Sequence, residues 1–294
     1  MGKVLLIGND INNVTNAYSW QNLITGLVDK AGLGDDMDLE NKPFPMLYEE
    51  IFLKSARALD TKERLLKEYI AHETAKMEVN ALHGKILGLK AEHILTTNYD
   101  LLLERAALLP RRACSNRGLV KEAKYSLFRY HEANDRKIWH IHGSETHPSS
   151  IALGYEHYGG YLQQMRNYVT VGTKTTYKSL KLDPLGKRLK KGIEQHTSWI
   201  DSFFLDDIHI FGLNLDFVEM HLWWLLTYRS RLMLGTQLDI RNRIFYYYPA
   251  KYEKRSKHKL EMLKVNGIET IPIPLKGTYK MAYYNRVIKE IANA

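Results

Sequence analysis

The stretch Ile94-Leu95-Thr96-Thr97-Asn98-Tyr99-Asp100 joins an apolar run to a polar turn, and Leu101-Leu102-Leu103-Glu104-Arg105-Ala106-Ala107 follows it at once. This pattern predicts a buried strand, a turn and then a helix. The carboxylate of Asp100 can accept unpaired N–H groups of the first helical turn, so we expect Asp100 to cap that helix. Asn98 then lies at the carboxyl end of a strand, where open α/β sheets bind their ligands.

Three other apolar runs also end in glycine and polar residues. Gly8-Asn9-Asp10 follows residues 3–7, His142-Gly143 follows residues 137–141, and Gly212-Leu213-Asn214 follows residues 207–211. Because the carboxyl ends of parallel strands share one edge of a doubly wound sheet, we expect all four polar segments to meet there. The scaffold would bring Asn98 and His142 together.

Alternating strands and helices along the whole chain favour an α/β fold, with a parallel sheet and helices on both faces. Without an internal repeat or a clear linker, we expect one domain, 1–294, with helical insertions at about 47–89 and 155–204. Asp60 with Glu63 matches the capping box that begins a helix. We expect strands at residues 3–7, 92–96, 125–130, 137–141, 207–211, 243–248 and 268–271, the third being a strand or a hairpin arm. Helices are expected at residues 20–30, 47–59, 60 onward, 101–109, 155–168, through 193 to 203, 217–234, 251–264 and 283–292.

The composition excludes several classes of protein. The 294 residues are 45% hydrophobic, which is enough to bury a core and makes disorder unexpected. No run of about 18 apolar residues predicts a membrane span, and the first apolar run is too short for a signal peptide. Cys114 is the single cysteine, which excludes an intramolecular disulfide or a cysteine-built zinc site and is typical of a reducing cytoplasm.

The formal net charge is +9, and residues 186–191 and 251–259 are rich in lysine and arginine. Such runs are usually solvated helix faces, but they can also attract a phosphate-bearing ligand, an acidic protein or nucleic acid. No compact nucleic-acid motif accompanies them, so nucleic acid is not expected as a partner.

The four strand ends together resemble the NAD-binding core of the sirtuin (silent information regulator) superfamily. Thr96-Thr97-Asn98-Tyr99-Asp100 resembles the family's T-Q-N-x-D element, His142-Gly143 its histidine–glycine element, and Gly212-Leu213-Asn214-Leu215 its later glycine–serine strand end. The resemblance covers residues 3–248 and implies a Rossmann-like fold. It is closer to the bacterial sirtuin-like proteins of anti-phage defence, many of which hydrolyse NAD, because Asp216 is followed by Glu219 and Trp223-Trp224-Leu225-Leu226.

The resemblance implies an NAD⁺ glycohydrolase that releases nicotinamide and ADP-ribose, acts in abortive infection, and uses NAD as substrate without a metal. Asn98 would hold a ribose hydroxyl or the attacking water, and His142 would be the general base. The implied NAD contacts are Gly8, Asn9, Asp10, Thr97, Asp100, Gly143, Gly212 and Asn214.

Two departures from the family pattern keep alternatives open. The family's G-A-G-x-S motif is here Gly8-Asn9-Asp10-Ile11-Asn12, and Asp10 would repel a pyrophosphate unless it turns away or meets a cation. A catalytically weak NAD- or ADP-ribose-binding sensor is therefore an alternative. Protein deacylation is less favoured, because one cysteine cannot build the four-cysteine zinc module of deacetylating sirtuins.

Each candidate residue also has a simpler interpretation. Asn98 could be a turn residue, and His142 could serve only to satisfy a structural hydrogen bond. His140 and His142 share a strand face by period two and could form a metal pair, although no third ligand is evident. Trp223 and Trp224 are expected in the core.

An NAD-destroying enzyme must be controlled in its host. No further domain is recognisable, so we expect a regulatory partner protein encoded nearby, a homo-oligomer, or both. Residues 251–264 and the segment near Arg188 are candidate docking surfaces for an acidic partner.

Overall fold

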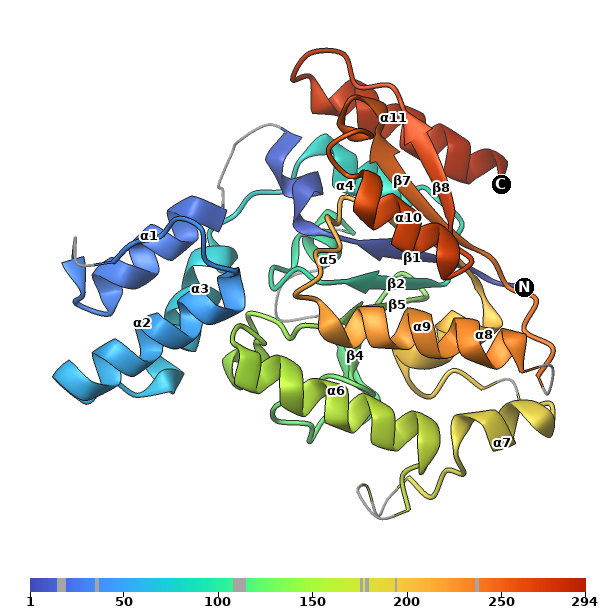
Figure 1. Cartoon of the computed structure of the whole chain (residues 1–294), viewed down its shortest axis with the longest axis horizontal. Helices are drawn as coiled ribbons and strands as arrows, with labels where there is room; N and C mark the ends of the chain where they lie inside the picture. The colour runs from blue at the N-terminus through green and yellow to red at the C-terminus, as the bar shows by residue number, and fades with distance from the viewer. Residues whose placement is uncertain are drawn as a thin grey trace.

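The centre of the molecule is a mostly parallel β-sheet. The computed structural model describes residues 1–14, 20–34, 37–107, 115–174, 177, 180–193, 195–235 and 238–294, and within them the strands form one eight-stranded sheet of order β3-β4-β5-β2-β1-β6-β7-β8 (Figure 1). Six strands are parallel: β1 (Lys3–Ile7), β2 (His93–Thr96), β5 (Arg136–His140), β6 (Asp207–Phe211), β7 (Ile244–Pro249) and β8 (Glu269–Ile273). β3 (Ser115–Arg117) and β4 (Tyr130–Ala133) are antiparallel at one edge. The predicted α/β, Rossmann-like fold is confirmed.

Helices cover both faces of the sheet, and the alternation along β1 shows the two faces directly. Val4 and Leu6 belong to one core, whereas Leu5 and Ile7 belong to the other. The first core includes residues of α6 (Tyr155–Thr170), α7 (Leu185–Lys190), α8 (Ser202–Leu205), α9 (Met220–Leu234) and α10 (Lys257–Val265). The second includes residues of α4 (Ala81–Leu87), α5 (Leu102–Ala106) and α11 (Lys280–Asn293). Burial on both faces explains why the central strands are continuous apolar runs.

Three helices form a lobe with a core of its own, and we call them the α1–α3 lobe. They are α1 (Trp20–Lys30), α2 (Phe44–Leu59) and α3 (Glu63–Ala75). Leu27, Tyr48 and Ile70 lie in this third core together with Tyr99, which follows β2. The lobe lies beyond the carboxyl ends of the parallel strands, to the left in Figure 1. It therefore faces the edge at which the sequence predicted the site.

Two local predictions were wrong for identifiable reasons. Residues 125–129 form no strand, because the carboxylate of Glu122 accepts the backbone N–H groups of Leu127, Phe128 and Arg129 at 3.1, 2.9 and 2.9 Å. Those donors are consequently lost to a strand ladder. Asp60 does not begin a helix but ends α2 in the left-handed conformation, with φ of 48°, and Lys62 precedes α3.

The helix predicted through residues 193 to 203 is also wrong. A 3-10 turn, Trp199–Asp201, and the short α8 replace it, after α7 has ended at Lys190. Asp201 accounts for the break, because its buried carboxylate accepts the N–H groups of Thr197 and Ser198, each at 3.0 Å. These two N–H groups are therefore bound by a side chain and are not available for the backbone hydrogen bonds of a helix.

Trp223 and Trp224 lie at the border of the core rather than inside it, since both are only partly buried. The indole N–H of Trp223 donates to the carbonyl of Asp216 at 3.0 Å, and Trp224 stacks on Tyr228. Cys114 and the predicted end of the helix at residue 109 lie outside the described residues. In the part of the chain that is described, no helix combines the length and apolar character that crossing a membrane requires.

Candidate active site

A cavity of about 730 Å³ lies at the carboxyl edge of the sheet. Its walls come from the turns after β1, β2, β5 and β6 and from the α1–α3 lobe, which contributes Leu23, Phe44 and Thr74. This volume is within the usual range of small-molecule sites. The rim of the sheet and the lobe thus enclose one site.

Most residues predicted for the site line this cavity, but two do not. Those in the wall are Asn9, Asp10, Thr97, Asn98, Asp100, His142, Gly212 and Asn214. Gly8 and Gly143 are not in the wall and act through the backbone. A Cβ on Gly8 would lie 2.4 Å from the carbonyl oxygen of Gly212. Gly143 has φ of +89°, and a Cβ there would lie 2.3 Å from the carbonyl oxygen of Ser150. Glycine is needed at both positions because another backbone segment passes too close to leave room for a side chain.

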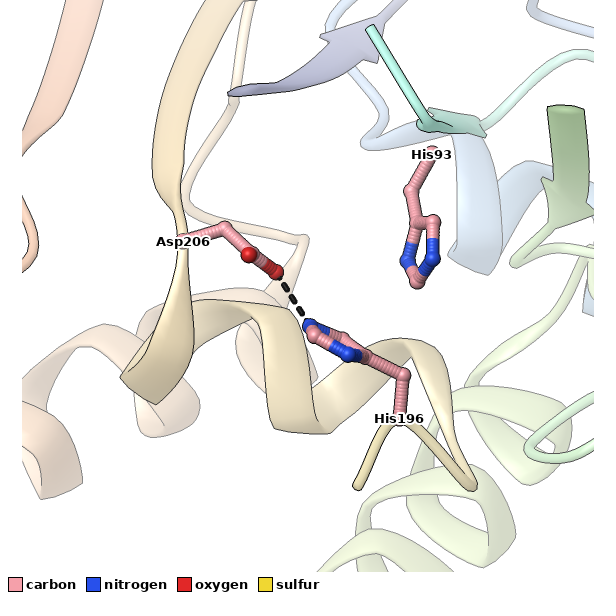
Figure 2. Close-up of side chains that lie close together, drawn as sticks. All are labelled: His93, His196 and Asp206. Carbon is pink, nitrogen blue, oxygen red and sulfur yellow. Dashed lines mark hydrogen bonds and ion pairs between the residues drawn. The ribbon is translucent and has the colours of Figure 1, made fainter. Parts of the chain in front are cut away.

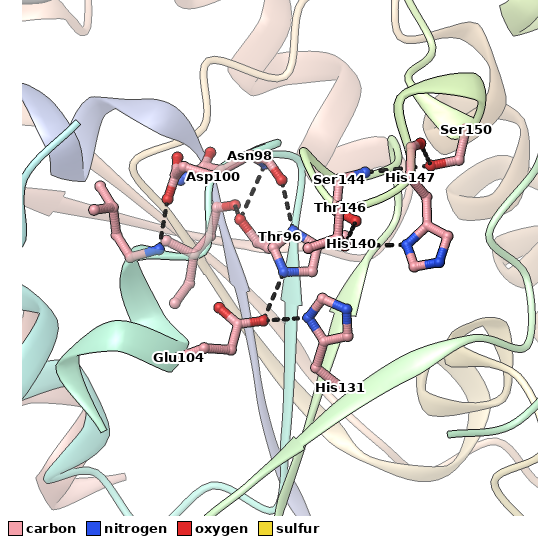
Figure 3. A network of polar contacts seen from close by, with 12 residues as sticks. Thr96, Asn98, Asp100, Glu104, His131, His140, Ser144, Thr146, His147 and Ser150 are labelled. Carbon is pink, nitrogen blue, oxygen red and sulfur yellow. Dashed lines mark hydrogen bonds and ion pairs between the residues drawn. The ribbon is translucent and has the colours of Figure 1, made fainter. Parts of the chain in front are cut away.

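The backbone of Asn98 is held at both of its polar groups. Its N–H donates to Oγ1 of Thr96 at 3.1 Å, and its carbonyl accepts a hydrogen bond from Nδ1 of His140 at 2.8 Å (Figure 3). Oδ1 of its side chain is buried and has no hydrogen-bond partner among the described residues. Leaving a buried acceptor unpaired costs about 1–3 kcal/mol. This oxygen is therefore available to a hydroxyl or water in the cavity.

The N-cap residue of α5 is Leu101 rather than Asp100, but Asp100 accepts an N–H of the first turn as predicted. Its Oδ1 accepts the N–H of Leu102 at 3.0 Å, and its Oδ2 accepts from Nδ2 of Asn12 at 2.9 Å. Oδ1 of Asn12 lies 3.0 Å from Nε2 of His83 on α4. Both carboxylate oxygens of Asp100 thus already hold protein donors, so this residue braces the turn.

His142 faces His221 on α9 and Glu219 just before that helix. Neither was predicted as a site residue from the sequence. Its Nε2 lies 2.8 Å from Nε2 of His221 and 3.4 Å from Oε2 of Glu219. Tyr158 stacks on His221, with ring centroids 5.2 Å apart. The available signal was Glu219-Met220-His221, directly before the apolar helix, but nothing in their spacing links them to a residue 79 positions away.

Burial sets the charge of this group. It lowers the pKa of His142 to about 3 and that of His221 well below its usual value, and it raises the pKa of Glu219 to about 8. Both imidazoles are therefore neutral at pH 7, so one ring donates and the other accepts in the bond between them. His142 thus lies at the cavity wall as a neutral ring, and burial makes it a weaker base than a free imidazole.

His140 lies near His142 in the sequence but has other partners. Its Nε2 is 2.8 Å from Oε1 of the buried Glu104, and Nδ1 of His131 is 2.7 Å from the same oxygen (Figure 3). Since His142 contacts His221 instead, His140 and His142 do not form the metal pair that was considered. Glu104 was not predicted either, because helical spacing cannot show which strand a buried carboxylate meets.

Three groups of histidine and acidic residues in the described structure have ligand atoms within 4.8 Å of one another. In His93, His196 and Asp206, at the amino ends of the strands, His196 and Asp206 already pair at 2.5 Å (Figure 2). In Glu104, His131 and His140, the carboxylate holds both rings. In His142, Glu219 and His221, atoms Oε2 of Glu219 and Nδ1 of His221 have no hydrogen-bond partner among the described residues. This third group, at the cavity, has the donor set that Zn²⁺ accepts.

Asp10 meets a cation, which removes the repulsion expected from it. Its Oδ1 lies 2.5 Å from Nζ of Lys280, and its Oδ2 accepts the hydroxyl of Tyr284 at 2.6 Å, both from α11. Lys259 of α10 similarly donates to Oδ1 of Asn214 at 2.7 Å. Among the described residues in the cavity wall Lys42 is the one cation, and it pairs with Glu50 at 2.7 Å. Positive charge thus reaches the rim mainly from outside the wall.

Residues 92–181 match the family model described as the SIR2-like domain. The match covers less than a third of the chain and includes β2, Asn98, His140 and His142. The match supports a sirtuin-like assignment for this segment, and the SIR2-like family uses NAD as substrate. A search of curated proteins found no match.

Proposed function

We propose that this protein hydrolyses NAD⁺ at the bond between nicotinamide and ribose, giving nicotinamide and ADP-ribose. One observation carries the proposal: an unpartnered acceptor, Oδ1 of Asn98, and a neutral imidazole, His142, share one cavity in a SIR2-like domain. The family match supports an NAD-dependent enzyme in general, and these two groups supply what hydrolysis needs.

The two groups divide the work. Oδ1 of Asn98 accepts a hydrogen bond from a ribose hydroxyl or from the attacking water, and such positioning can lower a barrier by several kcal/mol. His142 takes the proton released by that hydroxyl or water, a role that typically contributes about 10²–10⁴-fold. Asp216 and Glu219 also line the cavity. A carboxylate there offsets positive charge that develops on the ribose, and Glu219 adds its charge as pH rises through its raised pKa of about 8.

The test is NAD⁺ consumption by the purified chain, followed by chromatography of nicotinamide and ADP-ribose. Asn98→Ala and His142→Ala should each reduce turnover at least 100-fold while leaving the circular dichroism spectrum unchanged. His72→Ala is the matched control, because that imidazole is exposed on α3. Turnover at the parent rate in both site variants would show that the catalytic assignment is wrong.

We further propose that the reaction needs no metal. Turnover should then be unchanged after dialysis against EDTA, because a positioned water and a neutral base suffice. If EDTA abolished turnover and Zn²⁺ restored it, the group His142, Glu219 and His221 would be a metal site instead.

A sensor that binds NAD or ADP-ribose without cleaving it is the second candidate. It is favoured by the absence of the glycine-rich first motif and by the pairing of Lys42 with Glu50, which leaves the cavity wall without a free cation among its described residues. Calorimetry would show nucleotide binding, and no nicotinamide would be released with any activator. A deacylase would instead release O-acetyl-ADP-ribose from an acetylated peptide.

In the cell we propose an NAD-depleting role in abortive infection, held in check by a partner protein or a homo-oligomer. The basic helix α10 remains a candidate docking surface, but Arg188 does not, since its guanidinium is buried against Asp201 at 3.0 Å. Bacteria expressing the chain with its neighbouring genes should lose NAD on phage infection, and the His142→Ala strain should not. Full-speed hydrolysis by the isolated monomer, unchanged by any addition, would contradict control by a partner.

A further inference from the structure

Both ring nitrogens of His140 face oxygen atoms that accept hydrogen bonds. Nδ1 is 2.8 Å from the carbonyl oxygen of Asn98, and Nε2 is 2.8 Å from Oε1 of Glu104. A carbonyl can only accept, and so can an ionised carboxylate, whereas a neutral imidazole has a single N–H. Only the doubly protonated ring satisfies both bonds while Glu104 is ionised.

The surroundings favour the ionised pair over a protonated Glu104 beside a neutral ring. Oε1 of Glu104 also takes a bond from Nδ1 of His131 at 2.7 Å, so this one oxygen faces two imidazoles. Burial alone would lower the pKa of His140, but the charge of Glu104 outweighs it and holds that pKa above its usual value. Charge-assisted bonds of this length are about twice as strong as neutral ones.

The pair acts on Asn98 and not on anything in the cavity. Glu104 is completely buried and His140 is 5% exposed, and neither belongs to the cavity wall. Within the described residues, His140 bonds the carbonyl of Asn98 and Thr96 bonds its N–H, one on each side of the residue. The Asn98 side chain is therefore aimed by these two contacts.

We propose that Glu104 and His140 form a buried ion pair that positions Asn98, with the imidazolium holding the Asn98 carbonyl so that its side chain points into the cavity. The inference rests on the proposed function for its catalytic consequence only. Glu104 and His140 are positioning residues, because they reach the reaction through Asn98. A misplacement of about 1 Å at such a site can cost about 10²-fold in rate.

The variants separate the contact to Asn98 from the contact to Glu104. His140→Asn keeps an amide N–H near the place of Nδ1, whereas His140→Gln moves it toward Nε2 and leaves the Asn98 carbonyl without its donor. We expect kcat to fall about 100-fold in His140→Gln and about 10-fold in His140→Asn and Glu104→Gln, with KM changed less than threefold. His131→Gln is the matched control, because His131 bonds the same carboxylate oxygen without touching Asn98. His131→Gln should lower the free energy of unfolding as the other variants do, but its kcat should fall less than threefold.

Two measurements do not depend on NAD hydrolysis. In ¹⁵N NMR of the full chain at pH 7.5, both nitrogens of His140 should be protonated, and Glu104→Gln should convert the ring to the neutral form. In crystal structures, Asn98 should be displaced in His140→Gln and unmoved in His131→Gln. A neutral His140 in the parent protein, or an unmoved Asn98 in His140→Gln, would overturn the proposal. A parent protein that shows the imidazolium but never releases nicotinamide would instead count against the proposed function alone.

Discussion

At the scale of single residues, the site depends on groups that burial keeps uncharged. His142 is neutral at pH 7 because its pKa is lowered to about 3, and Glu219 is mostly protonated because its pKa is raised to about 8. The two side chains lie 3.4 Å apart at their nearest atoms. Of these two side chains, Glu219 is thus the one whose protonation changes near physiological pH.

This balance predicts the pH dependence of the proposed reaction. kcat/KM should show no acid limb near pH 6.5, because His142 stays neutral far below that value. It should rise through about pH 8 as Glu219 ionises and its negative charge comes to face the ribose. Initial rates from pH 5 to 9 measure the profile. The rise should vanish in Glu219→Gln, and a step near 6.5 in the parent would contradict the assignment of a buried neutral base.

Gly143 predicts a backbone effect on stability. Its φ of +89° is strained for other residues, and a Cβ there would lie 2.3 Å from the carbonyl oxygen of Ser150. Gly143→Ala should therefore lower the free energy of unfolding by about 3 kcal/mol. Gly277→Ala is the control, since that glycine has φ of +59° and open space around it, so that strain alone should cost about 1 kcal/mol. Equal losses in urea denaturation would show that the close contact is not decisive.

The sequence predicted Asn98 and His142 because each follows an apolar run that reads as a strand. It could not predict the partners that set their chemistry. His221 meets His142 across 79 positions, and Glu104 meets His140 across 36. Such pairs depend on how helices pack on the sheet, which hydrophobic spacing alone does not determine.

At the scale of elements, the carboxylate of Asp201 joins three segments. It accepts the hydroxyl of Tyr168 on α6 at 2.7 Å and pairs with Arg188 on α7, in addition to the two N–H groups of its own turn. Polar contacts of this kind fix helix ends that the apolar pattern leaves undetermined. Glu122 acts in the same way on residues 127–129.

Asp201→Ala should consequently be one of the most destabilising single changes. It leaves the buried guanidinium of Arg188 without its counter-charge, which typically costs about 3–5 kcal/mol. Chemical denaturation followed by tryptophan fluorescence measures the loss. Asp183→Ala is the control, because that carboxylate pairs with lysines at the surface, and its loss should leave the free energy of unfolding almost unchanged. Similar stability in the two variants would contradict the role of Asp201.

The elements that were predicted well are those whose sequence pattern and tertiary environment agree. β1, β2 and β6 are buried on both faces, so an unbroken apolar run identifies them. The errors at residues 60, 125–129 and 193–203 arise where one carboxylate or one left-handed residue decides the path of the chain. Local propensity carries little information about such contacts.

At the scale of the whole molecule, buried histidines predict sensitivity to acid. Burial lowers the pKa of His93, His142 and His209 to about 4, 3 and 4, with nearby cations adding to the effect at His93 and His209. The unfolded chain binds these protons near pH 6.5 and the folded chain does not, so stability is lost as pH falls from about 6.5 toward 4. His140 acts in the opposite sense, because its raised pKa contributes stability that is lost only as pH rises.

The urea midpoint should accordingly fall steeply between pH 7.5 and pH 5. Most of the fall should come below pH 6.5, where each neutral buried histidine contributes at most about 1.4 kcal/mol per pH unit. Circular dichroism at a series of pH values measures the midpoint. His209→Gln should reduce the slope, and a midpoint that does not change between pH 7.5 and 5 would contradict the burial of these rings as neutral groups.

Tyr99 joins the α1–α3 lobe to the rim of the sheet. Its side chain lies in the core of the lobe and its hydroxyl donates to the carbonyl of Ala152 at 2.8 Å, while the preceding peptide belongs to Asn98. The core of the α1–α3 lobe thus includes the residue next to Asn98, whose amide oxygen has no partner among the described residues. A displacement of these three helices would therefore be passed from Tyr99 to Asn98 through the one peptide bond between them, without crossing the sheet.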